Sequence, residues 1–80
     1  MERILIVDDD TYICKLLDNY LNKHGYHAES VYTGSSAMEK IRQKDYDLIL
    51  CDYRLPDRDG FDILRQAKSK DPPMPLVVTT

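Results

Sequence analysis

Three aspartates stand where short apolar runs of the chain end, and their side chains are the clearest candidates for chemistry. Asp8 and Asp9 directly follow the run Ile4–Val7, and Asp52 directly follows the run Leu48–Cys51. Three carboxylates brought together repel one another, which either raises a pKa or favours a bound cation. An all-oxygen cluster suits Mg²⁺, which keeps several waters and prefers one or two carboxylates plus phosphate oxygens. The alternative for Asp8 and Asp9 is that they are loop and helix-capping residues.

With Mg²⁺ bound, the carboxylate of Asp52 is suited to covalent phosphoryl chemistry. An aspartate oxygen can attack a phosphoryl group and hold it as an acyl phosphate. A metal ion neutralises the transferring oxygens, so that catalysis consists mainly of positioning and charge stabilisation. The hydroxyl of Thr80, at the end of the last apolar run, is placed to donate a hydrogen bond to the new phosphoryl group. A movement of that hydroxyl would report that the carboxylate had been modified.

The segments that carry these residues alternate between predicted strands and helices. Continuous apolar runs predict buried strands at residues 4–7, 47–52 and 76–80, and weak alternation predicts an outer strand at 26–32. After the first strand, apolar residues at helical spacing predict a helix, which Asp10 or Thr11 can cap at its start and Gly25 at its end. Its apolar stripe consists of Ile13, Leu16, Leu17, Tyr20 and Leu21.

Capping and turn signals predict two further helices. Residues 36–39 (Ser-Ala-Met-Glu) match a capping box at the start of a second helix, whose apolar side consists of Ala37, Met38 and Ile41. Asp59 and Gly60 turn the chain into a third helix, which Asp-Pro-Pro at residues 71–73 ends. Asp57 and Asp59 are interpreted as turn and N-cap residues rather than ligands. The apolar residues of the third helix are Phe61, Ile63, Leu64 and Ala67.

The order strand, helix, strand, helix, strand, helix, strand predicts an α/β fold with a doubly wound parallel sheet. Right-handed crossovers place helices on both faces of such a sheet. Ligands of these folds gather outside the carboxyl ends of the strands, where the strand order reverses. Asp8, Asp9, Asp52 and Thr80 all lie at predicted strand ends, so we expect them to converge on one edge of the sheet.

Composition and charge exclude several other classes of protein. The 80 residues correspond to one small domain, and a net charge of −3 from 11 basic and 14 acidic residues argues against a nucleic-acid-binding surface. The longest apolar runs have four residues and no signal-peptide pattern follows Met1, so we expect a cytoplasmic chain that does not enter a membrane. Cys14 and Cys51 lack metal-motif spacing and are predicted to be reduced core thiols.

Three segments together resemble the N-terminal part of a bacterial response-regulator receiver domain. They are Ile4–Asp9 (ILIVDD), Leu48–Gly60 (LILCDYRLPDRDG) and Pro75–Thr80 (PLVVTT). The resemblance implies a flavodoxin-like sheet with the strand order 2-1-3-4-5, for which the chemotaxis member of this family is a known example. It also implies that residues 1–80 form a partial receiver domain, which ends after the fourth strand.

The same resemblance implies a role for each residue of the site. Asp8 and Asp9 hold or orient Mg²⁺, and Asp52 is the phosphoacceptor. Arg54 contributes its backbone carbonyl to the metal, and Thr80 is the switch hydroxyl. The implied function is a phosphoacceptor switch, with a phosphohistidine of a sensor histidine kinase as donor and a downstream effector domain, such as a transcription regulator, as output.

The implied truncation has consequences of its own. The family's last helix, strand and helix segment is missing, and with it the lysine that pairs with the phosphoryl group. We therefore expect slow or undetectable phosphorylation of this chain by itself. An uncovered apolar sheet face and an unpaired edge at the fourth strand also predict self-association.

Two alternative functions belong to other classes of protein. Phosphohydrolases of the haloacid-dehalogenase type also use an aspartyl nucleophile, but they place a second aspartate two residues later as acid and base. That position is Arg54 here, which counts against turnover. The other alternative is a truncated assembly fragment that is not phosphorylated.

Overall fold

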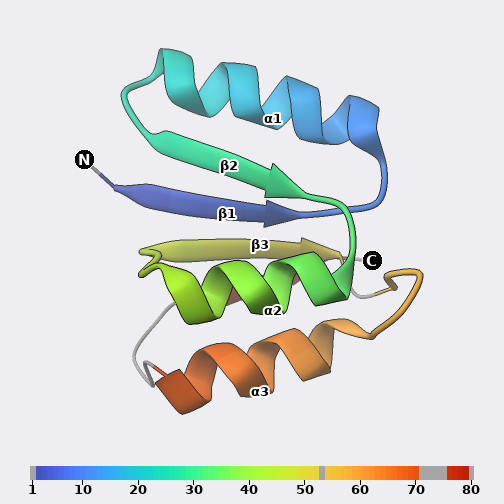
Figure 1. The fold of residues 1–80 in the computed structure, drawn as a ribbon. Helices are drawn as coiled ribbons and strands as arrows, with labels where there is room; N and C mark the ends of the chain where they lie inside the picture. Colours follow the sequence, from blue (N-terminus) through green and yellow to red (C-terminus); the bar gives the residue numbers. More distant parts are fainter. Residues whose placement is uncertain (1, 53, 71–75, 80) are drawn as a thin grey trace.

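The computed structural model describes residues 2–52, 54–70 and 76–79 of the chain. Strands and helices alternate along it, as the sequence predicts (Figure 1). Each predicted strand agrees with the observed one to within one residue at either end. The strands are β1 (Arg3–Val7), β2 (His27–Val31), β3 (Leu48–Asp52) and β4 (Leu76–Thr79), and the helices are α1 (Thr11–Lys23), α2 (Gly34–Gln43) and α3 (Gly60–Lys70).

The four strands form one parallel sheet in the order β2-β1-β3-β4. β1 lies between β2 and β3, with Ile4 opposite both Ala28 and Leu48. The predicted doubly wound sheet is therefore confirmed, with the first four strands in the expected order. The chain passes from β1 to β2 on one side and to β3 on the other, so the strand order reverses between β1 and β3. Ligands of such sheets gather at the carboxyl ends of the strands at this position.

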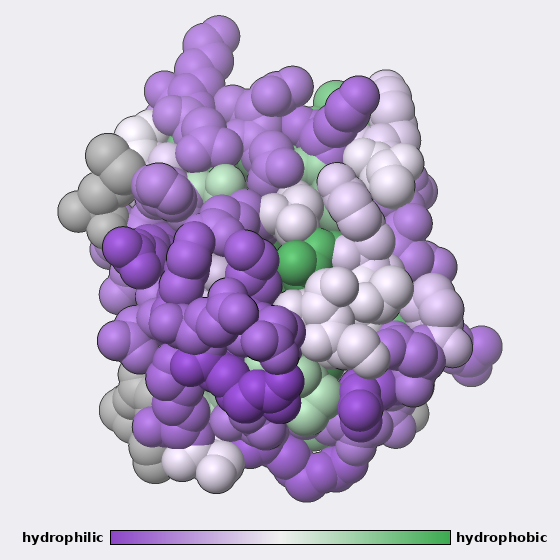
Figure 2. All heavy atoms as spheres, viewed as in Figure 1, coloured by the Kyte–Doolittle hydropathy of each residue, from purple (hydrophilic) through white to green (hydrophobic). Residues whose placement is uncertain are grey.

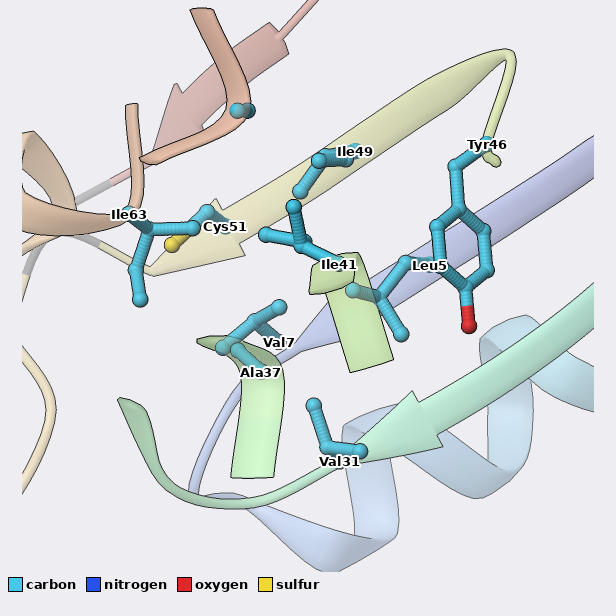
Figure 3. Packing of buried hydrophobic residues seen from close by; sticks show 10 residues of the cluster. Leu5, Val7, Val31, Ala37, Ile41, Tyr46, Ile49, Cys51 and Ile63 are labelled. Carbon is cyan, nitrogen blue, oxygen red and sulfur yellow. The ribbon is translucent and has the colours of Figure 1, made fainter. Parts of the chain in front are cut away.

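Each face of the sheet carries an apolar layer, with α1 on one side and α2 and α3 on the other (Figure 1). Successive strand residues point to opposite faces, so Leu5 and Val7 pack towards α2 and α3 whereas Ile4 and Ile6 pack towards α1. Figure 3 shows side chains of the larger cluster, which also contains Val31, Ala37, Ile41, Tyr46, Ile49, Cys51, Ile63 and Ala67. The central strand β1 is therefore buried on both faces.

α1 begins where the sequence indicates, and it ends at Lys23, with His24 as C-cap just before the predicted Gly25. Asp10 is its N-cap, and the Asp10 carboxylate accepts hydrogen bonds from the backbone N–H groups of Tyr12 at 3.0 Å and Ile13 at 3.3 Å. Of the two predicted capping residues, Asp10 rather than Thr11 has this role. Beyond the helix the chain turns at Gly25, whose φ of 91° lies in the left-handed region that favours glycine.

The apolar stripe of α1 is only partly buried. α1 packs over β1 and β2, and Cys14, Leu17 and Leu21 belong to the apolar layer on this side of the sheet. The remaining residues of the stripe are exposed, with exposed fractions of 37% for Ile13, 50% for Leu16 and 60% for Tyr20. The periodicity thus predicts the helix correctly but does not show which part of the stripe is covered.

α2 begins earlier than the predicted capping box. Its N-cap is Thr33, whose hydroxyl accepts a hydrogen bond from the backbone N–H of Ser36 at 3.1 Å. The prediction that Ser36 starts the helix is wrong, because the observed cap lies one turn before it. Glu39, the other end of the proposed box, pairs instead with Arg42 and with Gln43 further along the same helix.

α3 buries a narrower apolar side than predicted. Ile63 and Ala67 are fully buried against the larger cluster, whereas 49% of Phe61 is exposed. The carboxylate of Asp59 accepts a hydrogen bond from the backbone N–H of Asp62 at 3.1 Å, which confirms its predicted N-cap role. The side chain of Leu64 and the predicted stop at residues 71–73 lie outside the described part of the structure.

Both cysteines are free and buried, as predicted. They lie in the apolar layers on opposite faces of the sheet: Cys14 on the buried side of α1, and Cys51 of β3 in the layer beneath α2 and α3. The thiol of Cys14 donates to the backbone carbonyl of Asp8 at 3.3 Å. Burial raises the pKa of Cys51 to about 11, so this thiol stays protonated at neutral pH and acts as a small apolar side chain.

The outer edge of β2 is occupied by a side chain of α1. The N–H of His27 donates to Glu2 next to β1, so the backbone groups of the following residue, Ala28, point away from β1. The Asn22 side-chain amide binds both of them: Asn22 Oδ1 accepts from the Ala28 N–H at 3.1 Å, and Asn22 Nδ2 donates to the Ala28 carbonyl at 3.4 Å. At Ala28, the Asn22 side chain therefore makes the hydrogen bonds that the backbone of a further strand would make.

The longest helix in the described part of the chain is α1, with 13 residues. No described helix has the length and apolar character needed to cross a membrane. Figure 2 shows that the face seen in Figure 1 consists mostly of hydrophilic residues, with hydrophobic residues visible in a few places.

Candidate functional site

The predicted aspartates meet at the carboxyl ends of the two adjacent strands β1 and β3. Asp8 and Asp9 directly follow β1, and Asp52 is the last residue of β3. One carboxylate oxygen of each residue lies within 4.8 Å of the others. Asp9 is exposed, while Asp8 and Asp52 are partly buried. The expected convergence of these three side chains on one edge of the sheet is therefore observed.

Backbone hydrogen bonds hold two of the three aspartates in place. The N–H of Asp8 donates to the carbonyl of Val31 at the end of β2, at 3.2 Å. The Asp8 carboxylate in turn accepts from the N–H of Asp10 at 3.0 Å. On the other strand, the N–H of Arg54 donates to Asp52 Oδ1 at 3.2 Å. The loops after β1 and β3 thus orient the carboxylates through main-chain donors.

The electrostatics of the cluster favour a bound cation. Burial raises the pKa of Asp8, and the negative charges of Asp52 and Asp9 raise it further, while the hydrogen bond from Asp10 opposes the change. A divalent cation between the carboxylates would remove the repulsion and compensate for the burial. The donors are all oxygen atoms, which suits Mg²⁺ better than a metal that prefers nitrogen or sulfur ligands.

The predicted roles of two further residues, Arg54 and Thr80, are not tested by the structure. Arg54 lies beside Asp52 through its N–H group, and the role of its carbonyl stays a prediction. Thr80 lies outside the described residues, so its role as switch hydroxyl also stays a prediction.

Sequence reasoning missed the partner of Asp57. The Asp57 carboxylate accepts hydrogen bonds from the backbone N–H groups of Gly34 at 2.8 Å and Ser35 at 2.9 Å, and from the Ser35 hydroxyl at 2.6 Å. Asp57 therefore caps α2 from a loop that lies 22 to 23 residues further along the chain. The predicted turn role gave no indication of this contact, because no local pattern links residues so far apart.

These hydrogen bonds make Asp57 a determinant of acid stability. The Ser35 hydroxyl and then the Gly34 N–H lower the pKa of Asp57 from 3.8 to about 2. A carboxyl group with a lowered folded-state pKa stabilises the fold above its unfolded pKa, and this contribution is lost as the pH falls through the folded value. We expect the urea midpoint of the wild type to fall between about pH 4 and pH 2 more steeply than that of Asp57→Asn.

The control for this prediction is Asp45→Asn, which removes a carboxylate that is 92% exposed and forms a surface ion pair with Lys70 at 3.3 Å. Asp45 lies before β3, at the opposite end of the sheet from Asp52. Its urea midpoint should follow the wild-type pH dependence. Identical slopes for the wild type and Asp57→Asn would show that the Asp57 contacts do not contribute to stability.

An apolar groove leads to the acidic cluster on the α1 side of the sheet. Its volume is about 280 Å³, and its lining residues include Asp8 and Asp52 as well as Ile13 and Leu50. A larger cavity of about 580 Å³ lies near the amino ends of β1 and β3, where Tyr20 and His24 are among its lining residues. None of the three clustered aspartates lines this second cavity.

Comparison with known protein families gives one match that spans almost the whole chain. Residues 4–80 match the response regulator receiver domain. Among curated proteins, the transcriptional regulatory protein ZraR of Salmonella typhimurium is 38% identical over 77 residues. That alignment covers 96% of this chain but only 18% of ZraR, so the chain spans less than a fifth of this relative.

Two solved structures illustrate the similarity in fold. The CheY-like response regulator receiver domain protein from Methanospirillum hungatei is 36% identical and superposes with a TM-score of 0.93, over 98% of this chain and 62% of that chain. The response regulator TrrA of Thermotoga maritima, determined in complex with Mg²⁺ and BeF, is 25% identical with a TM-score of 0.84. This second match covers 100% of the chain and 88% of TrrA.

Proposed function

Because the chain belongs to the response regulator receiver domain family, we propose that it is a phosphoacceptor switch whose phosphorylated residue is Asp52. The coarser assignment, to the receiver part of two-component response regulators, follows from the family itself. The observation that carries the finer proposal is the cluster of Asp8, Asp9 and Asp52 at the carboxyl edge of the sheet.

The proposed cofactor is Mg²⁺. The carboxylates of Asp8, Asp9 and Asp52 would hold it, together with the backbone carbonyl of Arg54. When bound, the ion supplies positive charge that stabilises the oxygens of the transferring phosphoryl group. The Mg²⁺ and BeF complex of the related TrrA supports this choice, as does the all-oxygen donor set of the cluster.

The proposed reaction forms an acyl phosphate on Asp52. One Asp52 oxygen attacks the phosphorus of a phosphohistidine, and a new P–O bond forms as the P–N bond breaks. The electron pair of the broken bond stays on the imidazole nitrogen, which takes up a proton. The N–H of Arg54 orients the nucleophile through Asp52 Oδ1, and the hydroxyl of Thr80 is proposed to bind the new phosphoryl group.

The partners follow from the proposed function. A sensor histidine kinase would be the phosphoryl donor, and an effector domain would read the modified surface. A transcription regulator as effector is supported by the name of the relative ZraR. A second copy of the chain is a further proposed partner, supported by the exposed apolar residues Ile13 and Leu16 on α1.

Intact mass spectrometry after incubation with acetyl phosphate and Mg²⁺ tests the proposal. We expect slow accumulation of a single phosphate adduct that is hydrolytically labile, requires Mg²⁺, and is absent in Asp52→Asn. Asp45→Asn, which removes an exposed carboxylate at the other end of the sheet, should be modified like the wild type. An equal adduct in Asp52→Asn would rule out Asp52 as the acceptor.

The same incubation separates the alternatives. Continuous phosphate release from many phosphate esters would identify a phosphohydrolase, although Arg54 occupies the position of its expected acid and base. A folded chain that binds Mg²⁺ but forms no adduct would identify an assembly fragment. Circular dichroism on each variant shows whether the chain is folded.

A further inference from the structure

The loop between β3 and α3 is fastened to the first turn of α2. Both carboxylate oxygens of Asp57 take part: Oδ1 accepts from the Gly34 N–H, and Oδ2 accepts from the N–H and the hydroxyl of Ser35. The three distances lie between 2.6 and 2.9 Å. Each of these donors belongs to the start of α2, so a single side chain joins two elements.

The backbone around this contact is closely packed. Gly34 is buried, and a Cβ atom added to it would lie 2.8 Å from the Cβ of Arg58, closer than two such atoms approach. Glycine therefore allows the loop to sit directly against α2. The loop and α2 therefore touch through Arg58 and Gly34 as well as through the Asp57 hydrogen bonds.

Backbone contacts within the loop link Asp57 to Asp52. The N–H of Leu55 donates to the carbonyl of Arg58 at 3.1 Å, and Arg54 forms an antiparallel bridge with Asp59. The loop is thus a closed turn that contains Asp57, and Arg54 stands at its base. The N–H of Arg54 then binds Asp52 Oδ1 at 3.2 Å.

The strand before α2, β2, is linked to Asp8, which is the β1 part of the acidic cluster. α2 follows β2 after a two-residue connection, Tyr32 and Thr33, and the last residue of β2, Val31, accepts a hydrogen bond from the Asp8 N–H at 3.2 Å. Asp8 and Asp52 are therefore connected twice, once through the pairing of β1 with β3 and once around the edge through α2 and Asp57.

We propose that Asp57 is a positioning residue, which holds the Arg54 backbone and the Asp52 carboxylate at the geometry that a cation needs beside Asp8. The role in cation binding rests on the proposed function. Asp57 is not one of the proposed ligands, which are Asp8, Asp9, Asp52 and the Arg54 carbonyl. It acts through Arg54, as residues behind metal ligands commonly do.

Calorimetric titration with MgCl₂ tests this role on folded protein. Loss of a supporting residue of a metal site weakens binding roughly 10- to 100-fold, and we expect Asp57→Ala to weaken Mg²⁺ binding by about tenfold. Asp57→Asn keeps one acceptor oxygen and should recover part of the affinity. Ser35→Ala removes only the hydroxyl donor and should have the smallest effect. Asp45→Asn is the matched charge control. An unchanged affinity in Asp57→Ala would overturn the proposal.

A second measurement is independent of the metal. Without Mg²⁺, amide hydrogen exchange followed by NMR should be faster at Gly34 and Ser35 in Asp57→Ala, and also at Arg54. Faster exchange at Gly34 and Ser35 alone would show a helix cap without a positioning role, and would also overturn the proposal. Asp57→Asn provides the same comparison if Asp57→Ala does not fold.

The two measurements separate this proposal from the proposed function. If the wild type does not bind Mg²⁺, the proposed function and the cation-binding part of the inference both fail. Exchange at the Arg54 amide then still decides whether Asp57 positions the loop. If the wild type binds Mg²⁺ and Asp57→Ala binds it equally well, the positioning role fails while the proposed function stands.

Discussion

Replacing Ile41 with alanine is expected to lower the free energy of unfolding by about 2–5 kcal/mol, the usual cost of truncating a buried aliphatic side chain to alanine. Ile41 is fully buried in the cluster between α2 and the sheet, where it packs with Leu5 and Ile49 (Figure 3). A chain of 80 residues has a total stability of roughly 4–12 kcal/mol at 0.05–0.15 kcal/mol per residue. The substitution therefore removes a large part of the stability of the domain.

Urea denaturation followed by circular dichroism measures this effect. Ile13→Ala is the control, because it makes the same chemical change on α1 at a side chain that is 37% exposed. Its loss of stability should be clearly smaller. Equal losses for the two variants would show that the layer beneath α2 and α3 does not dominate the stability of the fold.

Asp8→Asn is expected to separate stability from cation binding. The pKa of Asp8 is raised by burial and by the neighbouring Asp52 and Asp9, so its charged form destabilises the fold at neutral pH. Asparagine removes the charge but keeps an oxygen that accepts from the N–H of Asp10. In the absence of divalent cations we therefore expect the variant to be more stable, by about 1 kcal/mol or less, the repulsion of two unit charges a few ångströms apart in water.

With Mg²⁺ present the order of stability should reverse. A ligand that binds only the folded state at 100 times its dissociation constant adds about 2.7 kcal/mol of stability. The wild type should gain this amount as Mg²⁺ is titrated, and Asp8→Asn should gain little, because one of its three carboxylates is gone. Thermal melts with and without Mg²⁺ measure both effects, with Asp45→Asn as control. An equal gain in Asp8→Asn would exclude Asp8 as a ligand.

The fold and the acidic cluster were predictable because both depend on local patterns. Runs such as Ile4–Val7 and Leu48–Cys51 are apolar at every position, as strands covered on two faces must be. Parallel pairing of adjacent strands then brings residues at their carboxyl ends, Asp8 and Asp52, to the same edge. The order of the elements gave the parallel sheet, whereas the adjacency of β1 and β3 was implied by the family resemblance.

The predictions that were wrong or missing concern two kinds of feature. One is a helix start where several residues compete for the N-cap position, and the other is a contact between distant parts of the chain. Residues 33–36 read Thr-Gly-Ser-Ser, and several of them are good N-caps, so the local pattern does not decide where α2 begins. Asp57 accepts hydrogen bonds from the backbone N–H groups of Gly34 and Ser35, which lie more than twenty residues before it in the chain. The exposed part of the α1 stripe, including Leu16 and Tyr20, depends on how α1 sits over β1 and β2, which periodicity does not give.

The Asn22 amide makes the β2 edge of the sheet less open to the addition of a further strand. A strand that approached β2 would have to displace both hydrogen bonds between Asn22 and Ala28, whereas β4 is the outermost strand at the other end of the described sheet. Pairing of a further strand with β2 would therefore cost the two hydrogen bonds at Ala28. One side chain of α1 thus protects the Ala28 position of the β2 edge against strand addition.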